Sequence, residues 1–268
     1  MKTQIIVALL LTSCGYFKNT PSSDAGANPN IPELRLKHAE WVSSVNAGGI
    51  LSLPDCDLAL WAGEARAGGA DVDLAGFEMA PGALRRNPGY PCTPASRDMV
   101  LGYAYGKWSI GDLPALQRLA DYGESHQWNM SSDASLSSID IVSRGVLGRA
   151  IASLSHDADK RSYAANPMAC IPLAKDYERH LQVLEALLEG EIVGGLPGGC
   201  VGVLKAFAED GPHDALFQAA YGIYSGDEGT AIDLLLDPAY VVPSYVRGAP
   251  NYDLVHRMFA ANTVLKRY

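Results

Sequence analysis

TPASRDMVLGYAYGKWSIGDLPALQRLADYGESHQWNM, residues 93–130, predicts two antiparallel helices joined by a tight turn. Thr93 is a suitable N-cap, and Pro94 at the first helical position loses no hydrogen bond there. Gly111 can end the first helix, and Asp112 can cap the second. The stretch therefore predicts an αα-hairpin, the unit from which we interpret the rest of the chain.

An arginine leads the apolar face of the first of these helices. Arg97 is an interior position on that face, and a buried guanidinium needs an acidic partner or a ligand. Asp98 follows directly, so we expect a charged group at one mouth of the hairpin; a purely structural ion pair is the alternative. The face follows helical spacing and has the residues Arg97, Leu101, Ala104, Tyr105 and Trp108.

The remaining sequence repeats helical patterns and contains no clear strand. Residues 104–112 and 220–227 resemble each other, and both join the end of one helix to the cap of the next. A recurring hairpin suggests stacking, because one pair of helices cannot bury its own apolar face. We predict an all-α fold of stacked αα-hairpins with about nine or ten helices, arranged as a partial α/α toroid or an α-solenoid, in a single domain over residues 32–268.

Size and charge restrict the possible functions. The 268 residues can bury one good core, and the net charge of −9 without any basic block argues against nucleic acid as a partner. Phosphate-loop and dinucleotide-binding motifs are absent from the sequence, and no cofactor is expected. Without a CxxC or His-rich spacing, we expect no metal site.

The N-terminus has the layout of an export signal. Residues 1–14, MKTQIIVALLLTSC, contain a lysine and then an apolar run too short to span a bilayer. Leu11-Thr12-Ser13-Cys14 resembles the lipobox of bacterial lipoproteins, which implies cleavage before Cys14 and its lipidation. Gly15 after the cysteine implies the outer membrane, and residues 15–31 are expected to form a flexible tether. An ordinary cleaved signal, with Cys14 incidental, is the alternative.

Export changes how the other four cysteines are interpreted. With Cys14 used by lipid, Cys56, Cys92, Cys170 and Cys200 remain, and an even number in an oxidising compartment favours disulfides. Of three possible connectivities we favour Cys56–Cys92 and Cys170–Cys200, because each pair brackets a loop next to a helix start. Buried free thiols are the alternative.

A long irregular stretch, residues 70–92, precedes the hairpin. Its prolines and glycines exclude a continuous helix, and loops of this length are usually lids, binding loops or disordered segments. Arg85, Arg86 and Tyr90 in it could contact an anion or a sugar face. The alternative is that both arginines are solvated and Tyr90 packs on a disulfide.

Two families offer general resemblances. Residues 225–237, SGDEGTAIDLLLD, resemble the turn and second helix of tetratricopeptide-type repeats, which are binding scaffolds. The hairpins, export signal, long loops and aromatic residues also resemble the α/α-toroid glycoside hydrolases and polysaccharide lyases, although no catalytic motif of any one family is present. That resemblance implies a sugar site at one rim, with Tyr90, Tyr105, Trp108 and Trp128 as aromatic contacts.

The candidate chemistry differs between the two reactions. Glycoside hydrolysis needs two carboxyl groups across a cleft, for which Asp55, Asp57, Asp98 and Glu178 are candidates. A lyase needs a base such as His180 or Tyr105 and a cation such as Arg97. Both readings compete with structural ones: the aspartates suit helix N-termini, and His180 suits a packing role.

The sequence therefore predicts an exported, lipid-anchored protein that binds or cleaves an envelope or extracellular polysaccharide. The predicted site is a rim that holds Asp55, Asp57, Arg97 and Asp98. A non-catalytic helical scaffold that binds a protein or peptide is the leading alternative, and a structural envelope lipoprotein is the third.

Overall fold

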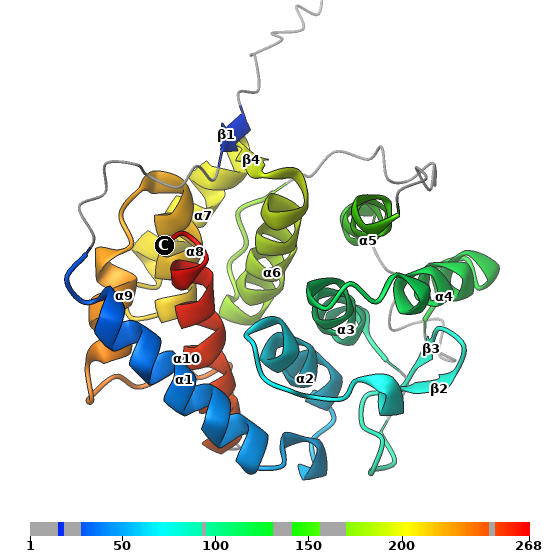
Figure 1. Cartoon of the computed structure of the whole chain (residues 1–268). Helices are drawn as coiled ribbons and strands as arrows, with labels where there is room; N and C mark the ends of the chain where they lie inside the picture. Colours follow the sequence, from blue (N-terminus) through cyan, green and yellow to red (C-terminus); the bar gives the residue numbers. More distant parts are fainter. Residues whose placement is uncertain (1–15, 19–27, 93–94, 131–140, 156–169, 247–249) are drawn as a thin grey trace, which may run out of the picture.

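The computed structural model describes residues 16–18, 28–92, 95–130, 141–155, 170–246 and 250–268. These residues form ten α-helices and four short strands, which confirms the predicted all-α fold (Figure 1). The predicted signal, lipobox and Cys14 lie outside the described residues. The predicted cap at Thr93 is wrong, because the first helix of the hairpin begins at Arg97 and has Ser96 as its N-cap. The helices are α1 (Ile31–Ala47), α2 (Leu58–Ala67), α3 (Arg97–Ser109), α4 (Leu113–Ser125), α5 (Ile141–Leu154), α6 (Asp176–Val193), α7 (Gly198–Asp210), α8 (Ala215–Ser225), α9 (Gly229–Leu236) and α10 (Pro250–Leu265).

The hairpin predicted from residues 93–130 is present as α3 and α4. Gly111 adopts a φ of 71°, a left-handed conformation that glycine reaches without strain. Asp112 caps α4 by accepting a hydrogen bond from the backbone N–H of Ala115 at 3.2 Å. Lys107, at the end of α3, forms an ion pair with Asp112 at 2.8 Å. The turn is therefore specified by the local residues that predicted it.

Three glycines let α2 and α3 approach each other closely. A Cβ on Gly63 would lie 1.9 Å from the carbonyl oxygen of Gly102, and one on Gly102 would lie 2.6 Å from Leu60 Cα. Gly106 continues the contact one turn further along α3, where a Cβ would lie 3.0 Å from Gly63 Cα. Because the contacts advance along both helices together, from Leu60 with Gly102 to Gly63 with Gly106, α2 and α3 run in the same direction and their N-terminal ends lie together.

Four more helices share this direction. Near its start α6 contacts Asp98 of α3, and near its end it contacts Tyr105 of α3. In the same way, the first and last turns of α10 contact Trp61 and Ala67 of α2 in that order. The successive contacts of α5 with α6, and of α8 with α10, give them the same direction. We call α2, α3, α5, α6, α8 and α10 the parallel helices.

Contacts between the parallel helices form a circuit. Each helix touches the next in the order α2, α3, α5, α6, α8, α10, and α10 touches α2 again. Outside this set, α1 lies alongside α10, although the two helices come from opposite ends of the chain (Figure 1). Hydrogen bonds from Arg35 to the Tyr268 carbonyl and from Asn251 to the Gly48 carbonyl show that α1 and α10 are antiparallel. The choice between a partial toroid and a solenoid stays a prediction.

The strands add two small features to the helices. β2 (Glu78–Ala80) and β3 (Ala83–Leu84) form a hairpin within the long loop. β1 (Tyr16–Lys18) pairs antiparallel with β4 (Gly195–Pro197), so part of the expected tether is held by backbone hydrogen bonds. β4 follows α6, which ends at Val193 with Gly194 as its C-cap, where φ is 73°.

Both predicted disulfides are confirmed. Cys56 pairs with Cys92, and Cys170 pairs with Cys200. The first ties the segment before α2 to the end of the long loop, directly before α3. The second ties the segment before α6 to α7. Each bridge therefore fixes a chain segment next to the start of a parallel helix.

Candidate functional site

Two residues at N-cap positions of the parallel helices do not cap their own helices with their side chains. Asp57 precedes α2 and Ser96 precedes α3, and both are residue types that usually accept a hydrogen bond from their own helix. Neither side chain makes such a bond. Departures from a local rule of this kind concentrate at functional sites, because another demand is placed on the side chain.

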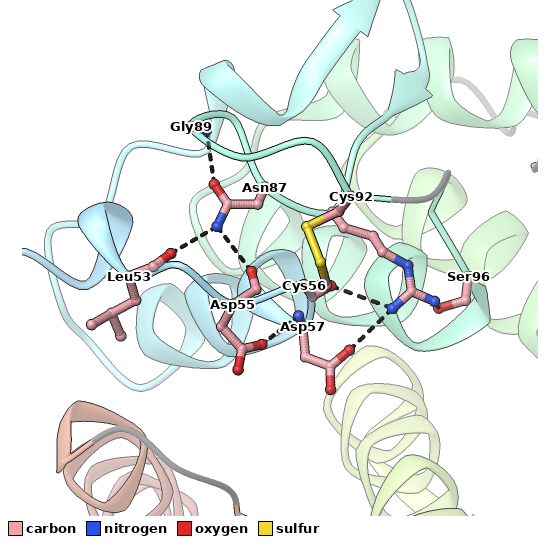
Figure 2. Close-up of a disulfide and its surroundings, with 9 residues drawn as sticks. Leu53, Asp55, Cys56, Asp57, Asn87, Gly89, Cys92 and Ser96 are labelled. Carbon is pink, nitrogen blue, oxygen red and sulfur yellow. Dashed lines mark hydrogen bonds and ion pairs between the residues drawn. A yellow bond between two sulfur atoms is a disulfide. The ribbon is translucent and has the colours of Figure 1, made fainter.

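The two side chains belong instead to one run of hydrogen bonds. Arg86 donates to Asp57 Oδ1 at 3.1 Å and to Ser96 Oγ at 2.8 Å (Figure 2). Ser96 in turn donates to Asp98 Oδ1, and the Tyr177 hydroxyl donates to Asp98 Oδ2. We call these five residues the polar chain; it links α2, the long loop, α3 and α6 through charged or charge-assisted bonds.

The loop that carries Arg86 is held firmly against the start of α2. Asn87 donates to the carbonyls of Leu53 at 2.7 Å and Asp55 at 2.9 Å, and its own side-chain oxygen accepts from the Gly89 N–H (Figure 2). The Cys56–Cys92 disulfide closes the same region. Arg86 is therefore positioned by neighbours that are distant in sequence.

Burial and negatively charged side chains at this end of the helices raise the pKa of two tyrosines. Burial, and then the negative charges of Asp98 and Asp57, raise the pKa of Tyr177. Burial and the charges of Asp55 and Asp57 likewise raise the pKa of Tyr252, in the first turn of α10. Both phenols therefore stay protonated at neutral pH and can act as hydrogen-bond donors.

A row of rings lies beneath the polar chain. Trp61, one turn into α2, stacks on Tyr252 at 5.0 Å and on His180 at 5.5 Å between ring centroids. His180 also packs against Tyr245 at 5.0 Å. We call Tyr252, Trp61, His180 and Tyr245 the aromatic row; all but the half-buried Tyr245 are buried. The row joins α10, α2 and α6 at the level just below their N-terminal ends.

Two histidine–carboxylate pairs are in contact with the aromatic row, one of them through His180 itself. His180 Nε2 lies 2.9 Å from Glu64 Oε1, and both side chains are fully buried. His256 lies 3.5 Å from Asp214, which also accepts a hydrogen bond from Tyr245 at 2.7 Å. Burial alone would raise the pKa of Asp214, but the hydrogen bonds and charge of His256 and the Tyr245 hydroxyl lower it. The core beneath the site is thus unusually rich in ionisable groups.

A hollow opens at the same end, between the starts of α6 and α8. Its volume is about 270 Å³, and Asp214 lies in its wall. Asp176, directly before Tyr177, lines it as well. The other lining side chains include Asp210, His213, Phe217 and Val241. Its acidic side chains are paired, because Arg179 contacts Asp176 and Asp210, and His256 and Tyr245 contact Asp214. The hollow therefore offers mainly apolar surface beside the polar chain.

The structure brings together only part of the predicted catalytic set. Asp57 and Asp98 belong to the polar chain, and Asp55 lies beside it, accepting from the Asp57 N–H at 2.6 Å. Arg97 instead lines a separate cavity of about 10 Å³ between α3, α5 and α6, which is too small for a ligand. Arg86, predicted as a substrate contact, has the central place that the sequence assigned to Arg97.

The other predicted contact residues are scattered. Arg85 donates to the Gly76 carbonyl, and Tyr90 is exposed in the long loop. Tyr105 and Trp108 lie toward the opposite end of α3, where they contact Glu191 and Ser153. Trp128 is buried beneath the Arg144 guanidinium, and His180 belongs to the aromatic row.

Sequence analysis does not single out five residues of this site. They are Ser96, Trp61, Tyr177, Tyr245 and Tyr252. The run Ser96-Arg97-Asp98 carried the one available signal, since a serine two residues before an aspartate at a helix start can share its hydroxyl with that carboxylate.

Across the described ranges, no group of three or more His, Cys, Asp or Glu side chains is arranged to hold a metal ion. No helix in the described part of the chain has the length and apolar character needed to cross a membrane. Comparisons with protein-family models, with curated proteins and with solved structures found no match to this chain.

Proposed function

We propose that the N-terminal end of the parallel helices binds or cleaves an extracellular or envelope polysaccharide. The observation that carries this proposal is the polar chain, in which two carboxylates, a guanidinium and a protonated phenol from four segments meet above aromatic rings. Sugar hydroxyls are bound by such planar charged groups, and aromatic rings supply the apolar contact.

The two carboxylates have different access to a substrate. The Asp57 side chain is 46% exposed, whereas Asp98 is buried beneath Ser96 and Tyr177. We therefore assign substrate contact to Asp57 and to Tyr177, which is also exposed, and positioning to Asp98. Arg86 keeps Asp57 in place and is a positioning residue.

The test is a polysaccharide panel assayed with the purified protein. We expect Asp57→Asn and Arg86→Ala to abolish the activity found, and the matched variant Arg85→Ala to retain it, because Arg85 contacts the Gly76 carbonyl instead of the polar chain. The products distinguish hydrolysis from elimination, because only elimination leaves an unsaturated sugar. A panel without binding or cleavage, measured on folded protein, would reject the proposal and favour a helical scaffold for protein or peptide partners.

We also propose that Cys14 is lipidated and holds the protein on the outer membrane. Cys14 lies two residues before β1, and β1 pairs with β4 beyond the C-terminal end of α6. A lipid there would keep this end near the membrane and leave the polar chain, at the other end of α6, facing outward. Labelling of cells with a fatty-acid analogue tests this: the wild type should be labelled and Cys14→Ser should not, and an unlabelled wild type would reject the anchor.

A further inference from the structure

A larger hollow lies at the opposite end of the parallel helices, where α2, α3, α6 and α10 finish. Its volume is about 550 Å³, within the usual range for small-molecule sites. None of its lining residues belongs to the polar chain or the aromatic row. The side chains that matter here are Arg66, Asp71, Trp108, Glu191, Asn262 and Lys266.

The indole in this hollow is held in one orientation. The Trp108 N–H donates to the Ser153 hydroxyl at 2.9 Å, and that hydroxyl donates to the Ala150 carbonyl at 2.8 Å. Tyr105 packs edge-on against the indole at 6.3 Å between centroids. A fixed, half-buried ring is a flat apolar surface that needs no ordering when a ligand binds.

The charges in the hollow balance. Arg66 pairs with Asp71 at 2.5 Å, and Lys266 pairs with Glu191 at 2.6 Å. Glu191 also accepts a hydrogen bond from Tyr105. With two cations and two anions already paired, the hollow offers little net attraction to a strongly charged ligand.

Several polar atoms retain hydrogen-bonding capacity. Among the contacts within the described residues, Asn262 donates to the Ala67 carbonyl while its side-chain oxygen accepts nothing, and Glu191 uses only Oε1. Lys266 donates to one partner, and Arg66 donates only through Nη1, within that part of the chain. Donors and acceptors thus lie side by side, and a hydroxyl group is both at once.

We propose that this hollow binds a neutral sugar unit. The Trp108 ring would contact one face of the sugar, while Asn262, Glu191, Arg66 and Lys266 would bind its hydroxyls. The inference is independent of the proposed activity at the polar chain, because the two sites share no residue.

The experiment measures binding of neutral sugars by saturation-transfer NMR and calorimetry. The probes are glucose, N-acetylglucosamine and the disaccharide of each, with glucuronic acid as the acidic comparison, added to the purified protein. We expect at least one probe to bind, with a Kd on the order of 1 mM. Trp108→Leu should weaken binding at least tenfold, and Lys266→Met should weaken it severalfold.

Two matched variants serve as controls. Trp41→Leu removes an indole of α1 outside the hollow, and Lys205→Met breaks the exposed Lys205–Glu209 pair of α7. Both should bind the sugar as the wild type does. If Trp108→Leu does not fold, Lys266→Met against Lys205→Met decides the question.

Three outcomes would overturn the inference: no probe binds, binding survives both hollow variants, or acidic sugars bind more tightly than neutral ones. Arg86→Ala separates this site from the polar chain. If Arg86→Ala binds the small sugars normally while the polysaccharide panel stays silent for the wild type, the hollow is supported and the proposed activity is rejected.

Discussion

Two arginine–carboxylate groups in this molecule are built in opposite ways. Arg118 donates to Glu78 from Nε at 2.9 Å and from Nη2 at 2.7 Å, whereas Arg86 donates to Asp57 Oδ1 from Nη1 at 3.1 Å. In the Glu78 group the carboxylate is 12% exposed and the arginine 41%. In the polar chain the arginine is 20% exposed and the carboxylate 46%. In the Glu78 group the arginine is the more exposed partner, whereas in the polar chain the carboxylate is the more exposed partner.

This reversal separates a structural group from a candidate site. Tyr103 and the Gly82 N–H also donate to Glu78, so its two oxygens together accept four hydrogen bonds. Such a carboxylate pins the β2–β3 hairpin to α3 and α4 and has no capacity left for a ligand. The Asp57 side chain is the more exposed carboxylate of the two groups and lies at the edge of the polar chain, where a substrate can reach it. The following predictions test the contrast, from the largest expected effect on stability to the smallest.

Removing the Cys56–Cys92 disulfide should have the largest effect. The bond closes a loop with a sequence separation of 36. Closing such a loop lowers the conformational entropy of the unfolded chain and so raises its free energy by about 3–4 kcal/mol. The double variant Cys56→Ser/Cys92→Ser should lose this free energy of unfolding in denaturant titrations. It should also lose ligand binding at the polar chain, because the loop that carries Arg86 is released.

The Glu78 group provides the comparison for that variant. If the contrast between the groups is right, Glu78 and Arg118 stay in contact when the disulfide is removed. Reduction of stability without any loss of polysaccharide binding would show that the disulfide does not position Arg86, and would contradict the role we give it.

Neutralising Glu78 should cost stability but not function. Hydrogen bonds to a charged group contribute about 1.5–3 kcal/mol, so Glu78→Gln should lower the free energy of unfolding by about 2 kcal/mol. Polysaccharide binding should not change. The control is Glu209→Gln, whose exposed partner Lys205 lies four residues earlier on α7; such pairs contribute about 0.3–0.5 kcal/mol. Equal losses in the two variants would contradict the structural role of Glu78.

The pH dependence of the Glu78 contribution follows from its pKa. Burial alone would raise this pKa, but the hydrogen bonds from Arg118 and Tyr103 lower it from about 4.5 to about 2. Between these values the unfolded chain binds a proton that the folded protein does not. The stabilisation is therefore fully present above about pH 4.5 and is lost as the pH falls toward 2. The difference in the free energy of unfolding between wild type and Glu78→Gln should therefore shrink as the pH falls over that range, in denaturant titrations at each pH. A difference that stays constant would contradict the lowered pKa of Glu78.

Part of the fold and part of the polar chain could be predicted from the sequence. The αα-hairpin, its cap at Asp112 and both disulfides depend on neighbouring residues or on cysteine arithmetic, and the sequence predicted them. Asp57 and Asp98 were also predicted at helix starts, but they lie at the same end only because α2 and α3 run in the same direction, and that direction is set by the contacts of Gly63, Gly102 and Gly106.

The choice of arginine could not be read in this way. Arg97 begins an apolar face, and helical periodicity alone makes it the buried cation. Arg86 takes the central place because Asn87 and the disulfide fold the long loop back on α2, and these contacts join residues about thirty positions apart. The aromatic row was missed for the same reason, since Trp61, His180 and Tyr252 come from three helices that each show an ordinary apolar pattern.

Tyr177→Phe should have the smallest effect on stability and still reduce function. The variant removes one donor from Asp98, which keeps the bond from Ser96, and Tyr177 is exposed enough for water to replace the lost hydroxyl. We expect a loss of about 1 kcal/mol in the free energy of unfolding. Polysaccharide binding or cleavage should fall much further than stability, because the phenol is one of the two accessible groups of the polar chain. The matched variant Tyr103→Phe removes a phenol from Glu78 and should show the reverse pattern, with stability reduced and function retained. If both variants lose stability alone, the polar chain is a structural group like that of Glu78, and the exposed carboxylate at its edge has no ligand.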